Sequence, residues 1–385
     1  MMKRLILTFF AVLLATGLQA RDSLSISLLT CSQGKDISSA FGHSAIRVKD
    51  VTTGEDLVFN YGTFSFEEPH FFLKFLRGDL NYCLSVNRFH NFKYSYEKAG
   101  RGIIEQPLNL TPWQENEIYL FLTDNALPEN RFYLYDFLQD NCATRIRDIF
   151  DREGFLITDT LTGATYRDEL TRLVGHYRWM MFGIDLLLGA KVDREISVRE
   201  AAFLPDRLSQ SMALYANPGI DSSSSAPLAS ECRVLLEPDP APGRWAGILS
   251  AATGPFPVFV ILLLFYLLFF MRTSRKWRFM HIFSTVLYAI LGTGGVILCL
   301  MWFATNHIWT ENNWNLLWMN PLMLIPVFLP NGVAKNLIID ILTLVAVLGL
   351  VFGWLIPQTF HPAVTVIILL LALVALSRRS IYRKY

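Results

Sequence analysis

The chain has 385 residues, of which 52% are hydrophobic, and its formal net charge at pH 7 is +1. A single soluble domain seldom has so large an apolar fraction, and a nearly neutral chain has no long-range field to attract nucleic acid. The composition therefore excludes an ordinary one-domain soluble protein and indicates no nucleic-acid partner. The apolar excess lies at the extreme N-terminus and from about Gly254 onward.

Residues 1–20 have the pattern of a secretory signal peptide. Lys3 and Arg4 precede an apolar stretch at residues 5–14, and Ala20 closes a small-residue cleavage site. The stretch is short for a bilayer span, so we expect cleavage; an uncut membrane anchor is the alternative. The region that follows is then exported.

The exported region begins with β-structure. Residues 25–30 are apolar and β-leaning, and residues 43–49 and 57–61 have the pattern of strands on either side of a turn signal at 52–56. This arrangement predicts a β-hairpin.

Helices follow the strands. Thr111 and Pro112 have the pattern of a helix cap and first residue, and a second helix start lies at residues 140–142. Residues 155–210 are expected to be mainly helical. Residues 221–242, rich in Ser, Pro and Ala, predict the flexible part of a linker toward the membrane domain.

The C-terminal third predicts an all-α transmembrane domain of about five helices. The third apolar run is short and broken by prolines, so a tilted or re-entrant segment is its alternative. Glycines in the second run predict close helix packing. Asp340, at the start of the fourth run, marks either an interfacial helix start or a functional site. The five runs are residues 257–271, 279–303, 316–329, 337–356 and 363–376.

Basic residues predict the orientation of these runs. If all five runs cross the bilayer, the basic positions share one side, while the loops on the other side, 304–315 and 357–362, carry no Lys or Arg. By the positive-inside rule the basic side is cytoplasmic. The exported region then lies outside, as the signal peptide requires independently. The basic positions are Arg272, Arg275, Lys276, Arg278, Lys335, Arg378, Arg379, Arg383 and Lys384.

Cys142 is the candidate nucleophile. It lies just inside a predicted helix start, where unpaired N–H groups and the helix dipole favour a thiolate. Arg145 adds positive charge one turn along, and the Cys142 backbone N–H is a candidate oxyanion donor. A buried or disulfide-bonded Cys142 is the alternative, because it forms with Cys31, Cys83 and Cys232 a set of four exported cysteines that allows three full pairings.

His43 is the candidate base, because a neutral imidazole beside the thiol can accept its proton. Asn60, on the return strand of the hairpin, can hold the orientation of the imidazole; Tyr61 is the alternative orienting group. No His or Cys pair has metal-ligand spacing and no phosphate-binding glycine loop occurs, so we expect neither a metal nor a cofactor. The rival histidines in the same region are His70, His90 and His176.

Together these residues resemble the papain-like thiol enzymes, and the order His43, Asn60, Cys142 is that of the permuted branch of the superfamily. A closer similarity is to the N-terminal periplasmic domain of Lnb-type lipoprotein N-acyltransferases. The blocks that carry it are LTCSQG at 29–34, FGHSAIR at 41–47, NYGTF at 60–64 and DNCATR at 140–145. The segments NHIWT at 306–310 and NWNLL at 313–317 resemble the membrane half of that family.

The resemblance implies an α+β, permuted papain-like periplasmic domain at residues 21–220, a linker at 221–254, a transmembrane domain at 255–377 and a cytoplasmic basic tail at 378–385. It also implies a thiol-dependent acyltransferase of the bacterial inner membrane with its catalytic domain on the periplasmic side.

In the reaction that this family implies, Cys142 forms a thioester with an acyl chain while His43 carries the proton. The α-amine of a diacylated lipoprotein then receives the chain. The donor is either the lipoprotein's own glyceryl group, as described for Lnb-type enzymes, or a membrane phospholipid.

Five residues are expected to contact substrate: Tyr61, Arg145, His307, Asn313 and Asn315. Two other functions remain open at this point. A periplasmic thiol peptidase or amidase of the cell wall would use the same catalytic residues. A non-enzymatic membrane receptor or assembly factor would instead hold Cys142 in a disulfide. The sequence indicates neither an oligomeric state nor an acyl-chain preference.

Overall fold

The structure is a computed structural model, which describes residues 24–64, 67, 69–217, 219, 227–229, 231–240, 243–272 and 276–382. The expected signal peptide lies outside the described residues. The chain forms two compact units. Unit 1 comprises Met1–Glu68, Asn81–Thr160 and Ser197–Pro240, and unit 2 comprises Pro69–Leu80, Leu161–Ile196 and Ala241–Tyr385.

Unit 1 is built on a seven-stranded sheet in the order β11-β5-β1-β2-β3-β4-β6, in which every neighbouring pair is antiparallel. The predicted hairpin is confirmed, since β2 and β3 pair with Ile46 opposite Phe59. The strands are β1 (Leu24–Cys31), β2 (His43–Asp50), β3 (Asp56–Thr63), β4 (Asn81–Arg88), β5 (Ile103–Pro107), β6 (Phe132–Leu134) and β11 (Arg233–Leu236).

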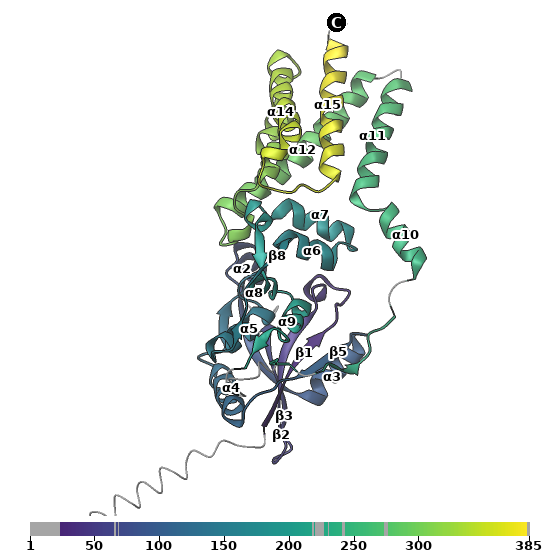
Figure 1. The fold of residues 1–385 in the computed structure, drawn as a ribbon. Helices are drawn as coiled ribbons and strands as arrows, with labels where there is room; N and C mark the ends of the chain where they lie inside the picture. Colours follow the sequence, from purple (N-terminus) through teal and green to yellow (C-terminus); the bar gives the residue numbers. More distant parts are fainter. Residues whose placement is uncertain are drawn as a thin grey trace, which may run out of the picture. The chain divides into compact units, whose positions relative to one another are not determined.

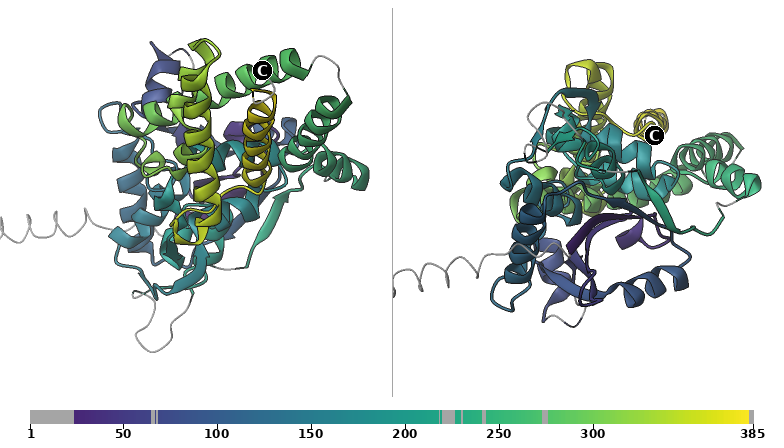
Figure 2. Two further views of the ribbon diagram at one scale, coloured as in Figure 1. Left: turned by 90° about the horizontal axis from the view of Figure 1, so that it is seen from above. Right: turned by 60° about the horizontal axis from the view of Figure 1, so that its bottom comes forward.

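Helices cover both faces of this sheet (Figure 1). One face packs against α4 (Pro112–Asn125), α5 (Cys142–Arg152) and α9 (Pro205–Ser211), and the other packs against α3 (Phe89–Lys98). The turned view in Figure 2 shows α3 apart from the other helices.

Alternation along the strands decides which side chains meet which helices. On β3, Phe59 and Tyr61 enter the core with α4 and α5, whereas Val58 packs with Phe92 and Tyr96 of α3. The even positions of β3, Asn60 among them, therefore face α3.

Unit 2 joins two helices of the exported region to the C-terminal helices. α6 (Tyr166–Val174) and α7 (Arg178–Leu187) are held by Arg167, which bonds Asp185 and Asp193 at 2.7 and 2.9 Å. Residues 161–196, which belong to the expected periplasmic domain at 21–220, therefore group with the C-terminal helices in unit 2.

Four of the five apolar runs form long helices: α11 (Pro255–Arg272), α12 (Lys276–Phe303), α14 (Val333–Val351) and α15 (Ala363–Tyr382). Within the described ranges, Trp277–Phe303 and Val333–Val351 are long and apolar enough to cross a membrane, and α10 (Arg244–Ala252) with α11 adds a third candidate that is bent by 47°.

The third run does not form a continuous helix, as the prolines within it predicted. It consists of η4 (Trp314–Leu317), η5 (Pro321–Leu324) and α13 (Ile325–Phe328). Pro321 and Pro326 lack the N–H that an α-helix interior requires. The broken segment packs against α12, where a Cβ added to Gly295 would lie 2.5 Å from the Met319 carbonyl oxygen. This confirms that the glycines of α12 permit close packing.

Basic residues gather at one end of these helices. Arg379 pairs with Asp340 at 2.9 Å, and Arg378 donates to Ser284 Oγ at 2.9 Å and to Asn336 Oδ1 at 3.2 Å. The starts of α12 and α14 and the end of α15 therefore meet, as the basic loops predicted. The ion pair also gives Asp340 a structural partner at this end.

Candidate active site

Cys142 is the first residue of α5, and its position depends on Asn141 as the helix cap. The Asn141 Oδ1 accepts from the backbone N–H groups of Ala143 and Thr144 at 2.8 and 3.0 Å. The Asn141 Nδ2 donates to the carbonyl oxygens of Phe137 and Phe203 at 2.7 and 2.9 Å. One buried amide thus ends the preceding loop, starts the helix and fixes the thiol at the positive end of the helix.

His43 opens β2, directly after Gly42. Gly42 has a φ of +79°, and a Cβ there would lie 2.9 Å from the Cys31 carbonyl oxygen, so a side chain would be strained and crowded. The His43 Nε2 is hydrogen-bonded to Asn60 Oδ1 on the neighbouring strand. Because that oxygen only accepts, Nε2 carries the hydrogen and the other ring nitrogen remains for the thiol.

The Cys142 thiol and the His43 imidazole are hydrogen-bond partners. Gly62 lies against both, because a Cβ built on it would be 3.6 Å from Cys142 Cβ and 3.7 Å from His43 Cε1. Gly62 has a φ of +88°, which L-residues rarely adopt. A glycine here leaves space beside the reacting atoms that any other residue would fill.

The pair is arranged to exchange a proton. Burial disfavours the Cys142 thiolate, but the charge of His43 and hydrogen bonds from His43, Ser44 and Ala143 outweigh it, so the pKa of Cys142 is lowered. Burial likewise disfavours imidazolium, but the Cys142 charge and bonds to Cys142 and Asn60 outweigh it, so the pKa of His43 is raised. Both shifts favour a thiolate–imidazolium pair.

Cys31 is a second thiol near this pair, and it has the opposite character. It lies directly across the strand pair from His43. Burial raises the pKa of Cys31 to about 12, although a hydrogen bond with Tyr96 opposes the shift. Cys31 therefore stays protonated near neutral pH, whereas Cys142 is the activated thiol.

Tyr133, on β6, is a further residue at this site, and the sequence patterns do not indicate it. Its side chain is buried, its hydroxyl faces the Gly62 backbone, and it lies within electrostatic range of Cys142. Burial raises the pKa of Tyr133, so the phenol keeps its proton. No local sequence signal marks it, because β6 has only three residues and approaches the site through its pairing with β4.

Two family profiles match the chain. The profile of the Lnb N-terminal periplasmic domain matches residues 16–169, and that of the Lnb transmembrane domain matches residues 249–385. The chain belongs to the Lnb family. This Lnb-family chain is therefore a membrane protein with a periplasmic domain, in which an α/β unit with an antiparallel sheet is followed by a helical region. It matches no curated protein and no solved structure.

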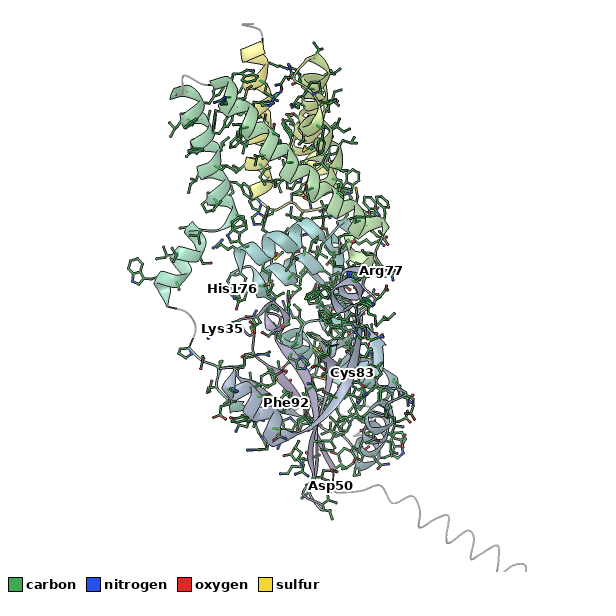
Figure 3. All side chains as sticks on the ribbon, turned by 180° about the vertical axis from the view of Figure 1, so that it is seen from behind. Lys35, Asp50, Arg77, Cys83, Phe92 and His176 are labelled. Atoms are coloured by element: carbon green, nitrogen blue, oxygen red, sulfur yellow. The ribbon has the colours of Figure 1, made fainter. Side chains whose placement is uncertain are left out.

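A polar cavity of about 360 Å³ in the Lnb-family chain lies beside Asn60, the residue that bonds His43, and its lining residues include neither Cys142 nor His43. Asn60 forms one wall, and α3 contributes Phe92, which Figure 3 labels, and Tyr96. The Arg101 guanidinium stacks over the Tyr96 ring at 4.6 Å, and its Nε donates to the Ser32 carbonyl oxygen at 2.9 Å. The remaining lining residues of the cavity are Asn87, Asn91, Ser95 and Ala99.

The contacts of Tyr61 and Arg145 differ from those expected of substrate-binding residues. Tyr61 is 1% exposed, and its hydroxyl donates to Asn125 Oδ1 at 2.9 Å, so it serves the core on the sheet face opposite Asn60. Arg145 forms a two-bond ion pair with Asp140 and lies 4.1 Å over the Tyr133 ring. Its charge is therefore already paired.

Three further expected substrate residues lie in unit 2 and support its packing. The Asn313 Nδ2 donates to the Leu186 carbonyl oxygen at 2.7 Å, and the Asn315 Nδ2 donates to that of Asp185 at 2.9 Å. Both amides are buried, and the hydrogen bonds that they donate support the packing of unit 2. The His307 Nε2 bonds the carbonyl oxygen of Phe75 at 3.1 Å, in α2 (Phe71–Arg77).

Proposed function

We propose that this Lnb-family protein is a lipoprotein N-acyltransferase of the bacterial inner membrane. The observation that carries the proposal is the activated Cys142 thiol, hydrogen-bonded to a histidine that Asn60 orients. Membership of the Lnb family and the helical membrane region support a substrate with acyl chains in the bilayer. A domain at the membrane surface can reach such chains without extracting a whole lipid.

In the first step, the Cys142 thiolate attacks the carbonyl carbon of an acyl ester. A C–S bond forms, the ester C–O bond breaks, and the His43 imidazolium gives its proton to the departing alkoxide. The product is a thioester on Cys142 and a free hydroxyl on the donor. Asn60 holds the imidazole so that one ring nitrogen faces the thiol throughout.

In the second step, the neutral α-amine of the lipoprotein's N-terminal cysteine attacks the thioester. An amide C–N bond forms, the C–S bond breaks, and His43 takes the proton that the amine loses. Each step places negative charge on the former carbonyl oxygen. The backbone N–H of Cys142 and the neutral Tyr133 hydroxyl are the donors that we assign to this oxyanion.

A non-enzymatic receptor or assembly factor, in which Cys142 would form a disulfide, has less support. Cys142 is a free thiol, as are Cys31 and Cys83. A cell-wall peptidase would use the same thiol and imidazole but does not need a multi-helix membrane region. Lipid and peptidoglycan assays on one preparation separate these activities.

The direct test is mass spectrometry of a lipoprotein N-terminus from cells that lack any other lipoprotein N-acyltransferase. We expect an N-acylated cysteine when the wild-type chain is present and a free α-amine with Cys142→Ala. A lyso-glyceryl product identifies the lipoprotein itself as donor, and a triacylated product identifies a phospholipid. N-acylation that persists with Cys142→Ala, at equal protein level, contradicts the proposal.

A further inference from the structure

Unit 2 contains a cavity of about 790 Å³ that the proposed chemistry does not use. Its walls come from α6, α7, the first turn of α11 and the segment that leads into α15. Figure 1 shows α6 and α7 lying across the ends of α11 and α15. These ends are opposite the basic end where Arg378 and Arg379 lie. The cavity therefore lies at the periplasmic edge of the membrane helices.

Aromatic contacts join the elements that surround this cavity. The Trp179 Nε1 of α7 donates to the Thr253 carbonyl oxygen at 2.9 Å, and the Phe182 ring lies 5.8 Å from that of Phe259 on α11 and 5.0 Å from that of His361. α7, the start of α11 and the segment before α15 are thus in contact beside the cavity. A concave site with mainly apolar walls and a few convergent polar groups is typical of ligand binding.

The polar groups have a distinct distribution. Arg178 lies across the start of α11, since a Cβ on Gly254 would be 2.8 Å from its Cδ, and it acts electrostatically on His361. Two carboxylates also line the cavity: Asp185 is paired with Arg167 at 2.7 Å, and Asp168 accepts hydrogen bonds from the backbone N–H and hydroxyl of Thr165 at 2.9 and 2.8 Å. Arg178 and the N-terminus of α11 therefore present positive charge at one place. Met181, Phe256 and Phe360 supply apolar wall.

We propose that this cavity binds the diacylglyceryl group of a membrane lipid, with its oxygen-rich glycerol ester region at Arg178 and its acyl chains against the apolar wall. The choice of a diacylglyceryl ligand rests on the proposed function. Phospholipids and diacylated lipoproteins both carry this group, and a guanidinium can donate to the ester or phosphate oxygens of either. The cavity is then a lipid-binding site whose residues come from other segments of the chain than His43, Asn60 and Cys142.

The test uses the full-length protein in bilayer nanodiscs and a diazirine-labelled lipid, supplied either as a phospholipid or as a diacylated lipopeptide. We expect labelled peptides to contain Met181 or Phe256, and Arg178→Gln to lower this labelling about tenfold. Arg178→Lys should restore part of it. Labelling by only one of the two lipids identifies the source of the diacylglyceryl group.

Two controls make the outcome decisive. Leu344, on α14, is 57% exposed and reports contact with bulk lipid, so its labelling should not respond to Arg178→Gln. Alkylation of Cys142 should also be unchanged, which separates failure of this site from failure of the catalytic proposal. The inference is overturned if Met181 and Phe256 are labelled no more than Leu344, or if Arg178→Gln leaves their labelling unchanged.

Discussion

At the scale of single residues, the proposed function depends on the charge state of one thiol. Burial alone would keep Cys142 protonated, and the His43 charge together with the hydrogen bonds from His43, Ser44 and Ala143 reverses that effect. The same physics leaves Cys31 inert, since no comparable charge compensates its burial. Two cysteines near one another thus differ in reactivity because only one lies at a helix start beside an imidazole.

The pH dependence of Cys142 alkylation follows from these shifts. The pKa of Cys142 is lowered, so the thiolate should persist at pH values below those at which an ordinary thiol ionises. It should therefore react rapidly with iodoacetamide at neutral pH. His43→Ala removes the opposing charge and leaves burial, so the midpoint of the rate profile should move to higher pH. Cys31, with its pKa raised to about 12, should stay unmodified and serves as the internal control. An unmoved midpoint in His43→Ala would contradict the ion pair.

Asn60 should influence rate through the orientation of His43. Asn60→Ala removes a hydrogen bond to the charged His43 ring, and such a bond contributes about 1.5–3 kcal/mol. If the transition state loses this stabilisation, thioester formation should be roughly 10- to 100-fold slower. Asn60→Asp retains an acceptor and should recover part of that loss. Because Tyr61 packs on the opposite sheet face, Tyr61→Phe should leave the pH profile of the rate unchanged. A full rate with Asn60→Ala, measured by stopped-flow acylation, would remove its positioning role.

At the scale of elements, local sequence signals predict the helix start and the β-hairpin on which Cys142, His43 and Asn60 lie. The start of α5 follows from Asn141 and Cys142, and the hairpin follows from alternation and a turn signal, so both could be found in the sequence. Alternation along β3 also places Asn60 and Tyr61 on opposite faces, which excludes Tyr61 as the orienting group once β3 is known. Gly62 and Tyr133 could not be assigned, because their roles depend on contacts between strands and helices distant in sequence.

The helix cap gives a prediction at this scale. Asn141→Ala removes the cap, worth about 1 kcal/mol, and two buried bonds to carbonyl oxygens of about 1 kcal/mol each, so it should lower the melting temperature markedly. It should also slow Cys142 alkylation, because the thiol loses its fixed place at the helix start. Thr165→Ala removes the cap of α6 and is the matched control. That control should cost about 1 kcal/mol and leave alkylation unchanged; equal effects of the two variants on alkylation would refute the assignment.

At the scale of the whole molecule, the sequence predicted a periplasmic region and a helical membrane region but not how the chain is shared between the two compact units. Residues 161–196 lie within the expected periplasmic domain, and their contacts group them with the C-terminal helices in unit 2. The sequence favours Asn313 and Asn315 as substrate ligands because polar residues in an outer loop suggest exposure. The amides are instead buried and bonded to carbonyl oxygens near the end of α7.

Arg167 tests the importance of this arrangement. Its side chain is 4% exposed and bonds Asp185, Asp193 and the Leu188 carbonyl oxygen. Arg167→Leu leaves two buried carboxylates without their partner, for which we expect a loss of about 3–5 kcal/mol. Lys191→Met removes a half-exposed ion pair with Glu311 and should cost at most about 1 kcal/mol. Thermal unfolding of both variants in detergent measures the difference, and similar melting temperatures would show that the buried network contributes little.

The central claim is that an acyl chain passes through the sulfur of Cys142. Intact-mass spectrometry of the full-length protein, quenched in acid shortly after mixing with a diacylated lipopeptide, measures this intermediate directly. We expect a mass gain of one acyl chain that maps to the peptide containing Cys142, is released by neutral hydroxylamine and is absent in Cys142→Ala. Acyl transfer at the wild-type rate by Cys142→Ala, or an acyl adduct on another residue, would contradict the account.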